Sequence, residues 1–277
     1  MNPETVQQAS EVIRDADGLL VCAGAGMGAD SGLPTFRGDD GFWKAYPALA
    51  NLKIRFVEMA NPQWFVDDPE RGWAFYGHRH QLYSVTEPHE GFQILRKWAN
   101  PMPIGTFVFT SNVDGHFQKA GFPRDRVHEC YGSIMHLQCI SGCRNIWPTE
   151  KLNLEIDMGT LRAHGELPAC PDCGAMARPN ILMFSDWGWV SERSDQQERQ
   201  LDEWIRGGRD RQLVIIEIGA GMAVPTVRYF SEEVAQQPGA TLIRINTEAP
   251  EGPPGTISMD CGALEALQAI DGKLTVN

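Results

Sequence analysis

The stretch GLLVCAGAGMGADSGLPTFRG, residues 18–38, decides the fold of this chain. It starts with an apolar run of strand length and continues into a turn where Gly24, Gly26 and Ala29 form a pattern of two glycines followed by a small residue. Such glycines let backbone amides approach a pyrophosphate. The carboxylate expected about 20 residues later to bind a ribose is missing. The stretch therefore favours a nucleotide-binding turn over an ordinary dehydrogenase, and a plain tight turn remains open.

Three further stretches share the length and apolar character of a buried strand: residues 105–112, 213–221 and 241–248. Helical patterns separate them, starting with an amphipathic N-terminal helix. Continuous apolar strands that end in Gly, Asn or Asp turns predict an α/β fold with a Rossmann-like parallel sheet covered on both faces. Ligands of such sheets bind at the carboxyl ends of the strands.

Two segments interrupt this alternation. Residues 39–88 read as a helical insertion rich in aromatic residues, and residues 133–184 read as a zinc-binding module. The Rossmann-like domain then consists of residues 1–38, 89–132 and 185–277. A chain of 277 residues has room for one main domain with insertions of this size.

Acidic residues outnumber basic ones by 36 to 24, which gives a net charge of -12. This charge repels phosphate backbones, so we expect no nucleic-acid partner and better steering of basic peptides.

The most apolar stretch, residues 213–224, is too short to cross a bilayer and contains Glu217. The N-terminus has no basic leader followed by an apolar run. We therefore expect a cytoplasmic protein without a membrane partner.

Four of the seven cysteines form two pairs, Cys139 with Cys143 and Cys170 with Cys173. Two such pairs on separate turns can complete a tetrahedral thiolate shell around Zn2+. A shell of four thiolates leaves no position for substrate, so this metal would be structural. A redox role for the four thiols is the alternative. The other three cysteines, Cys22, Cys130 and Cys261, are expected to be buried free thiols.

Taken together, the motifs resemble those of the sirtuin family of NAD-dependent protein deacylases. The matching blocks are GAGMGADSGLPTFRG, TSNVDGHFQKAG, ECYG, the two cysteine pairs, RPNILMFSDWGW, IGAGMAVP and INTE, in the order of the family and over nearly the whole chain. The resemblance implies a Rossmann-like domain, a small zinc-binding domain, and a cleft between them for NAD and an acyl-lysine peptide.

The resemblance also implies roles for individual residues. The residues expected to bind the cofactor are Gly24, Ala25, Gly26, Phe36, Arg37, Ser111, Asn112, Asp114, Gly219, Gly221, Asn246 and Glu248. Asn246 and Glu248 would bind the adenosine ribose. Asn112 and Asp114 would line the nicotinamide pocket and are also expected to be catalytic. The substrate-binding set is Tyr76, Arg79, Met183, Phe184 and Trp187.

Within that set, Tyr76 and Arg79 form a Y-x-x-R pair. Sirtuins that remove succinyl, malonyl or glutaryl groups use such a pair, because the guanidinium binds the acyl carboxylate through two hydrogen bonds. Without the resemblance, a surface arginine and a core tyrosine on one helix would explain the same residues. We expect a pocket that recognises a carboxylate.

Three positions depart from the family pattern: Gly28 replaces a serine, Ser111 a glutamine, and Tyr131 the catalytic histidine. In sirtuins that histidine deprotonates a ribose hydroxyl. At neutral pH about one tyrosine in a thousand is ionised, which raises the barrier by up to ~4 kcal/mol. His116 could replace the missing base, but we expect it to be a solvated helix residue. His128 lies three residues before Tyr131, and the alternation of side chains along a strand would turn it to the opposite face.

Tyr131 predicts a protein-lysine deacylase, of the deacetylase or the desuccinylase/demalonylase type, that binds NAD and peptide but turns over slowly. Two alternatives stay open. One is an NAD hydrolase or ADP-ribosyltransferase that uses the same pocket. The other is a non-catalytic sensor of NAD or ADP-ribose, for which Tyr131 is the main support.

Overall fold

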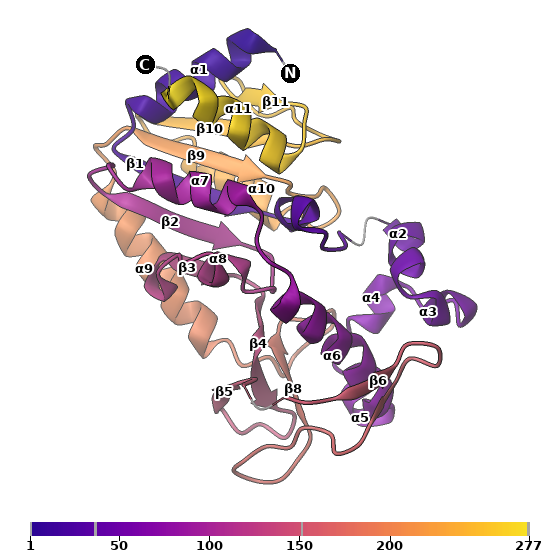
Figure 1. The fold of residues 1–277 in the computed structure, drawn as a ribbon. Coiled ribbons are helices and arrows are strands. Elements are labelled where there is room, and N and C mark those ends of the chain that lie inside the picture. The colour runs from indigo at the N-terminus through magenta and orange to yellow at the C-terminus, as the bar shows by residue number, and fades with distance from the viewer. Residues whose placement is uncertain (1, 36–37, 151, 276–277) are drawn as a thin grey trace.

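The computed structural model describes residues 2–35, 38–150 and 152–275. A parallel sheet and its helices form one part of the molecule, and a smaller lobe of short helices and strands forms the other (Figure 1). The sheet strands are β1 (Gly18–Ala23), β2 (Gly105–Thr110), β3 (Val127–Glu129), β9 (Leu213–Ile218), β10 (Ala240–Ile245) and β11 (Ile257–Met259). The predicted α/β fold is confirmed, together with all four expected strands.

The strand order is β11-β10-β9-β1-β2-β3, and every neighbouring pair is parallel. This is the order of a doubly wound dinucleotide-binding sheet, whose direction of winding reverses between β1 and β9. The register places Ala23 beside Ile218, so both strands end at the same level. A crevice is therefore expected where the chain leaves these two strands.

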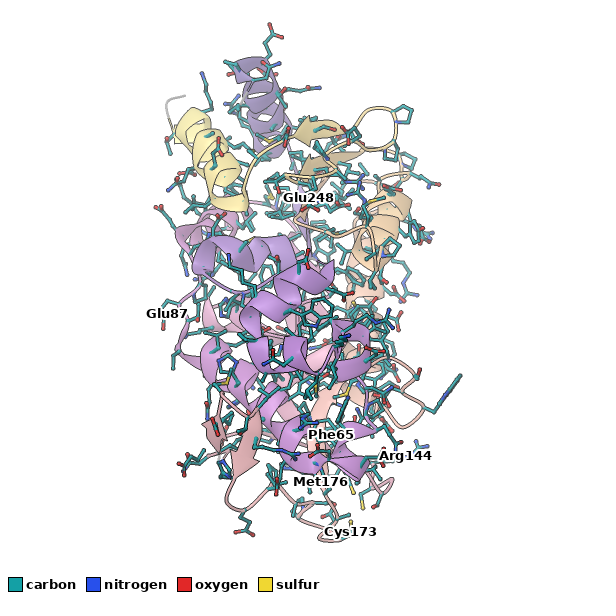
Figure 2. All side chains as sticks on the ribbon, turned by 90° about the vertical axis from the view of Figure 1, so that its right-hand side faces the viewer. Phe65, Glu87, Arg144, Cys173, Met176 and Glu248 are labelled. Atoms are coloured by element: carbon teal, nitrogen blue, oxygen red, sulfur yellow. The ribbon has the colours of Figure 1, made fainter. Side chains whose placement is uncertain are left out.

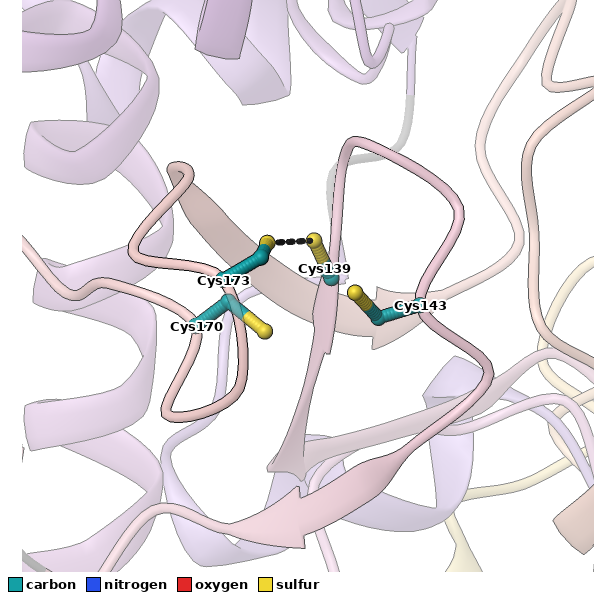
Figure 3. Close-up of side chains that lie close together, drawn as sticks. All are labelled: Cys139, Cys143, Cys170 and Cys173. Carbon is teal, nitrogen blue, oxygen red and sulfur yellow. Dashed lines mark hydrogen bonds between the residues drawn. The ribbon is translucent and has the colours of Figure 1, made fainter.

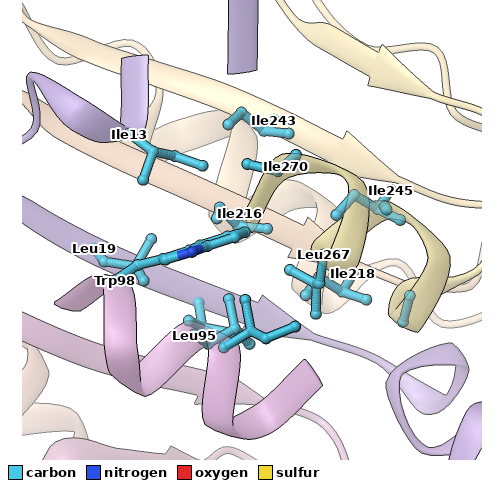
Figure 4. Close-up of a cluster of buried hydrophobic side chains, with 14 of the residues drawn as sticks. Ile13, Leu19, Leu95, Trp98, Ile216, Ile218, Ile243, Ile245, Leu267 and Ile270 are labelled. Carbon is cyan, nitrogen blue, oxygen red and sulfur yellow. The ribbon is translucent and has the colours of Figure 1, made fainter. Parts of the chain in front are cut away.

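Helices cover both faces of the sheet because its strands are buried on both sides. On one face, α1 (Pro3–Arg14), α7 (Glu90–Ala99) and α11 (Ala263–Thr275) pack their apolar sides on the sheet. Figure 4 shows Trp98 of α7 and Leu267 of α11 among the isoleucines of β9 and β10. On the other face, α9 (Glu192–Gly207) and α10 (Thr226–Val234) close a second core.

The small lobe combines the two segments that interrupt the alternation. Its helices are α2 (Gly38–Ala45), α3 (Pro47–Asn51), α4 (Phe56–Met59), α5 (Trp64–Asp67) and α6 (Pro69–Val85). Its strands are β4 (Gly132–Cys139), β5 (Ile146–Pro148) and β8 (Ala177–Ile181), which form an antiparallel sheet, and the hairpin β6 (Glu155–Asp157) and β7 (Arg162–His164). One hydrophobic core joins both segments, and the Trp73 indole of α6 donates a hydrogen bond to the Ala177 carbonyl of β8, 3.1 Å away.

Three short helical turns complete the chain: Ala25–Ser31 after β1, α8 (His116–Lys119) after β2, and Arg124–Arg126 before β3. No helix among the described residues is long and apolar enough to span a membrane. The proposed boundaries of the Rossmann-like domain, the helical insertion and the zinc module stay a prediction.

Candidate active site

The turns that follow β1 and β9 meet at the point where the winding of the sheet reverses. The Gly26 N–H donates a hydrogen bond to the Gly219 carbonyl at 3.0 Å, and the Gly24 N–H donates to the Ile218 carbonyl at 2.9 Å. A Cβ atom on Gly26 would lie 2.6 Å from the Cα of Gly219. Gly219 also has a φ of +60°, which side chains disfavour. We call these turns, Gly24–Gly26 and Gly219–Gly221, the glycine crevice.

A cavity of about 220 Å³ opens beside the glycine crevice. Gly26, Ala29, Gly219 and Asn246 are among the residues that line it. The Asn246 amide nitrogen donates to the Ala220 carbonyl at 2.8 Å, and its oxygen accepts from the Glu248 N–H at 3.0 Å. Asn246 thus fixes the turn after β10 against the turn after β9. Figure 2 shows Glu248 in the sheet part of the molecule, far from Cys173 at the tip of the small lobe.

Asn112 and Asp114 follow β2, and Asn112 supports the glycine crevice from its other side. The Asn112 side-chain amide donates a hydrogen bond to the Gly24 carbonyl at 2.9 Å, and the Ser111 N–H donates one to the Ala23 carbonyl. The buried Asp114 carboxylate accepts from the His116 N–H at 2.8 Å. Burial raises the pKa of Asp114, and the nearby charge of His116 opposes this shift. The residues after β1, β2, β9 and β10 therefore converge on one edge of the sheet.

The prediction that His116 is a solvated helix residue is wrong, because its side chain is buried and the residue is only 1% exposed. Its ring packs against Phe92, and its Nε2 lies 3.4 Å from the Tyr83 carbonyl. A helix of one turn has too few residues for periodicity to show which side faces solvent. His128 is also buried, and its Nε2 lies 3.2 Å from the Ser194 hydroxyl.

Tyr131 lies where the chain passes from β3 to β4, and its side chain is half-buried. Its hydroxyl lies 2.5 Å from the hydroxyl of Thr226, the first residue of α10. Burial raises the pKa of Tyr131, and the hydrogen bond with Thr226 partly offsets that effect. The pocket therefore makes this phenol a weaker acid than a free tyrosine. We call Tyr131 and Thr226 the Tyr131 corner.

Tyr76 and Arg79 are both buried on α6. The Arg79 Nε donates to the Tyr83 hydroxyl at 2.9 Å, and its guanidinium lies 5.6 Å from the Tyr76 ring centroid. Burial raises the pKa of Tyr76 to about 12. The Y-x-x-R pair thus lies inside the small lobe, so the interpretation of Arg79 as a surface arginine is wrong.

The segment after β8 carries the other expected substrate residues. Met183 is buried, the Phe184 N–H donates to the Ala60 carbonyl at 2.9 Å, and Trp187 is 99% exposed. A buried ion pair fixes this turn, since Arg178 binds both carboxylate oxygens of Asp186 at 2.8 Å. An exposed indole beside a fixed turn is available to an incoming chain.

The four cysteines of the two pairs converge at the tip of the small lobe (Figure 3). Their sulfur atoms all lie within 4.8 Å of one another, and the Cys139 and Cys173 sulfurs are 3.6 Å apart. Tetrahedral Zn–S bonds of about 2.3 Å place sulfurs about 3.8 Å apart. Cys139, Cys143, Cys170 and Cys173 therefore fit a structural zinc ion. Of the remaining thiols, Cys22 and Cys261 are buried as expected, and Cys130 is half-buried.

Two expected cofactor residues, Phe36 and Arg37, lie outside the described residues. Sequence reasoning missed Thr226, Tyr83 and Asp186, which hold Tyr131, Arg79 and the Trp187 turn. No local pattern marks Thr226, because its partner Tyr131 is 95 residues away and only the fold brings the two together. Tyr83 follows Arg79 by four residues on α6, so helical spacing could have indicated that contact. Gly28, which replaces a serine, is buried, and a Cβ there would lie 3.2 Å from Leu33 Cδ1.

Comparisons with known proteins agree with this geometry. Residues 24–224 match the Sir2 family. An NAD-dependent protein deacylase of Aquifex aeolicus is 30% identical over 230 residues, which cover 83% of each chain. One of Thermococcus kodakarensis is 28% identical over 87% of this chain and 84% of the relative.

A solved structure described as a complex of a Sir2 homologue with NAD superimposes with a TM-score of 0.69 at 26% identity, covering 97% of this chain and 94% of the other. The family match spans well over half of the chain, and the sheet order, the glycine crevice and the four thiols fit it. This chain is a member of the Sir2 family of NAD-dependent protein deacylases.

Proposed function

We propose that the protein is an NAD-dependent protein-lysine deacylase whose turnover is slowed by Tyr131. The observation that carries the proposal is the glycine crevice at the winding reversal, with Asn112, Asp114 and Asn246 placed around it. Relatives that match over more than four fifths of the chain are named NAD-dependent protein deacylases.

The chain's own residues define how the cofactor would be held. The glycines of the crevice allow a diphosphate close to the backbone, and Asn246 and Glu248 would bind the adenosine ribose. Asn112 and Asp114 would line the nicotinamide side, together with Ala25 and Ser111. When bound, NAD would supply a ribose carbon that the acyl oxygen of the substrate attacks, with nicotinamide as the leaving group.

Tyr131 is expected to be a poor general base for this reaction. A raised phenol pKa leaves even less phenolate at neutral pH than the one part in a thousand of a free tyrosine. The hydroxyl is also engaged by Thr226 at 2.5 Å. Binding needs no base at this position, so the proposal separates binding, which is retained, from turnover, which is slow.

The acyl group would enter the small lobe towards Tyr76 and Arg79. A buried guanidinium surrounded by aromatic rings is weakly screened by water, which strengthens its attraction for a carboxylate. We therefore propose succinyl, malonyl or glutaryl lysine as the preferred substrate class. Met183, Phe184 and Trp187 would border the peptide.

We further propose that the substrate is an acylated lysine of a cytoplasmic protein and that the enzyme has no nucleic-acid partner. Seven cysteines without a disulfide, four of them placed to bind zinc, are typical of proteins from a reducing compartment. The net charge of -12 favours basic protein segments around the acyl-lysine and repels nucleic acid.

The second candidate function is a sensor that binds NAD or ADP-ribose without turnover. The contact between Tyr131 and Thr226 favours it, because this contact leaves the position of the base occupied by a hydrogen-bonded phenol. An NAD hydrolase or ADP-ribosyltransferase would use the same crevice and has no separate observation in its favour.

Calorimetry and product analysis on the zinc-loaded protein test the proposal. NAD is titrated with and without acetyl-lysine and succinyl-lysine peptides, and nicotinamide and deacylated peptide are then quantified over long incubations. A slow deacylase binds NAD and releases the two products in equal amounts. Nicotinamide release without peptide would establish the hydrolase instead, binding without any product would establish the sensor, and failure to bind NAD would refute all three.

A further inference from the structure

A buried cluster of charged residues lies behind the turn that follows β10. Glu217 of β9 and Arg244 of β10 are 0% exposed, and Arg228 of α10 is 6% exposed. The Arg244 guanidinium donates to Glu217 Oε2 at 2.7 Å and to Glu232 Oε1 at 2.7 Å. Burial of several charges is unfavourable unless each has partners, and here the arginines and the carboxylates compensate one another.

The two arginines also bind the main chain of residues 249–251. Arg228 donates to the Ala249 carbonyl at 2.9 Å and to the Glu251 carbonyl at 3.0 Å, and Arg244 donates to the Glu251 carbonyl at 2.6 Å. Hydrogen bonds from a charged donor are about twice as strong as neutral ones. This part of the chain has no strand or helix of its own to fix it.

The same turn is held from the opposite side by the cavity residue Asn246. Its side-chain oxygen accepts from the Glu248 N–H at 3.0 Å and from the Ala249 N–H at 3.4 Å. Ala249 is thus bound at its N–H by Asn246 and at its carbonyl by Arg228. The position of Arg228 therefore sets the backbone path between the cavity and the buried cluster.

We propose that Arg228 is a positioning residue for the adenosine side of the cofactor pocket. It does not line the cavity, and it acts by fixing residues 246–251 so that the turn that carries Asn246 and Glu248 keeps its path beside the cavity. This inference rests on the proposed NAD-binding function. The ligand class it concerns is a nucleoside diphosphate sugar such as ADP-ribose.

The test uses Arg228→Met and Arg228→Lys in the full-length, zinc-loaded protein. Methionine keeps the length of the side chain and removes every donor, whereas lysine keeps the charge that faces Glu217, 4.0 Å away, and can donate to one carbonyl. Arg206→Met is the matched control, because Arg206 is exposed on α9 and its Nε binds only a carbonyl of its own helix, that of Asp202.

Calorimetry should show the Kd for ADP-ribose and NAD rising about tenfold in Arg228→Met and about threefold in Arg228→Lys, with no change in Arg206→Met. The affinity for an acyl-lysine peptide alone should stay that of the parent, because the peptide contacts other residues. A merely structural arginine would lower both affinities together, and that result would overturn the inference.

The outcomes also separate this inference from the proposed function. A parent protein that binds neither ADP-ribose nor NAD would overturn both. A parent that binds ADP-ribose with the same Kd as a folded Arg228→Lys or Arg228→Met variant would overturn the positioning role alone. Circular dichroism and zinc content establish that each variant is folded before it is titrated.

Discussion

The glycine crevice and the Tyr131 corner serve the same proposed reaction but are built in different ways. At the crevice two turns meet through main-chain contacts, because Gly26 and Gly219 leave no space for a side chain between them. The corner is held by a hydrogen bond between two side chains, those of Tyr131 and Thr226. The proposed binding function would therefore depend on glycines that tolerate little change, whereas the proposed effect on turnover would depend on the side chain at position 131.

Removal of the metal should have the largest effect and should act on the Tyr131 corner more than on the crevice. Structural zinc contributes about 10 kcal/mol or more to the folding of a four-thiolate module. Chelation, or Cys170→Ser at a buried ligand, should release the zinc and open the tip of the small lobe to proteolysis. Metal analysis and limited proteolysis measure this.

The sheet domain provides the control for the metal experiment. Its cores do not include the cysteine tip, so NAD calorimetry on the metal-free protein should still detect binding. Loss of helicity throughout the chain after chelation would show that the sheet domain depends on the metal as much as the small lobe does.

Gly219→Ala should break the crevice and leave the corner in place. Its Cβ would lie 2.3 Å from the Gly26 Cα at a φ of +60°, and strain and overpacking together should lower the free energy of unfolding by about 4 kcal/mol. Denaturant unfolding and NAD titration measure the change. Gly272→Ala in α11 is the control, because a Cβ there meets nothing within 4 Å. Equal stability of the two variants would contradict the tight contact.

Acid should destabilise the strand that leads to the corner, through His128. Burial lowers the pKa of His128 from 6.5 to about 4, so the folded state favours the neutral ring. Its stabilising contribution is complete above pH 6.5 and is lost as the pH falls towards 4, by up to about 3 kcal/mol. Urea unfolding at pH 7 and pH 4.5 measures the loss. His128→Phe should flatten this dependence, and an unchanged pH profile in that variant would show that other groups cause it.

Arg79→Met should have the smallest effect and tests whether Arg79 recognises the carboxylate of the acyl group. Loss of the guanidinium should weaken binding of a succinyl-lysine peptide about tenfold, and affinity for an acetyl-lysine peptide should change little. Peptide calorimetry in the presence of ADP-ribose measures both. Arg71→Met, at another arginine of α6, is the control, since Arg71 pairs with Asp68 at 3.3 Å. Equal losses for both peptides would contradict carboxylate recognition.

The sequence predicted the structure best where a local residue pattern determines the conformation of the backbone. Apolar runs predicted β1, β2, β9 and β10, and the cysteine spacing predicted the four-thiolate cluster, because burial on both faces and metal chelation each leave a local pattern. The three-residue strands β3 and β11 leave no such pattern, and the fold alone defines them.

Contacts between distant side chains could not be predicted. The partner of Tyr131 is Thr226, and the burial of His116 arises from packing on Phe92, which the sequence places 24 residues earlier. The buried charges around Glu217 were likewise unexpected in an apolar strand, since the arginines that compensate them come from α10 and β10.

The most direct test of the central claim is the rate of deacylation before and after Tyr131→His, with succinyl-lysine peptide and saturating NAD at pH 7.5. Histidine restores a base that is mostly neutral at this pH, so the rate should rise by about 100- to 1,000-fold while the Kd for NAD stays the same. The residual activity of the parent should climb with pH up to and beyond 10, because burial raises the pKa of its phenol. A rate that does not rise in a folded, NAD-binding Tyr131→His protein would contradict the account.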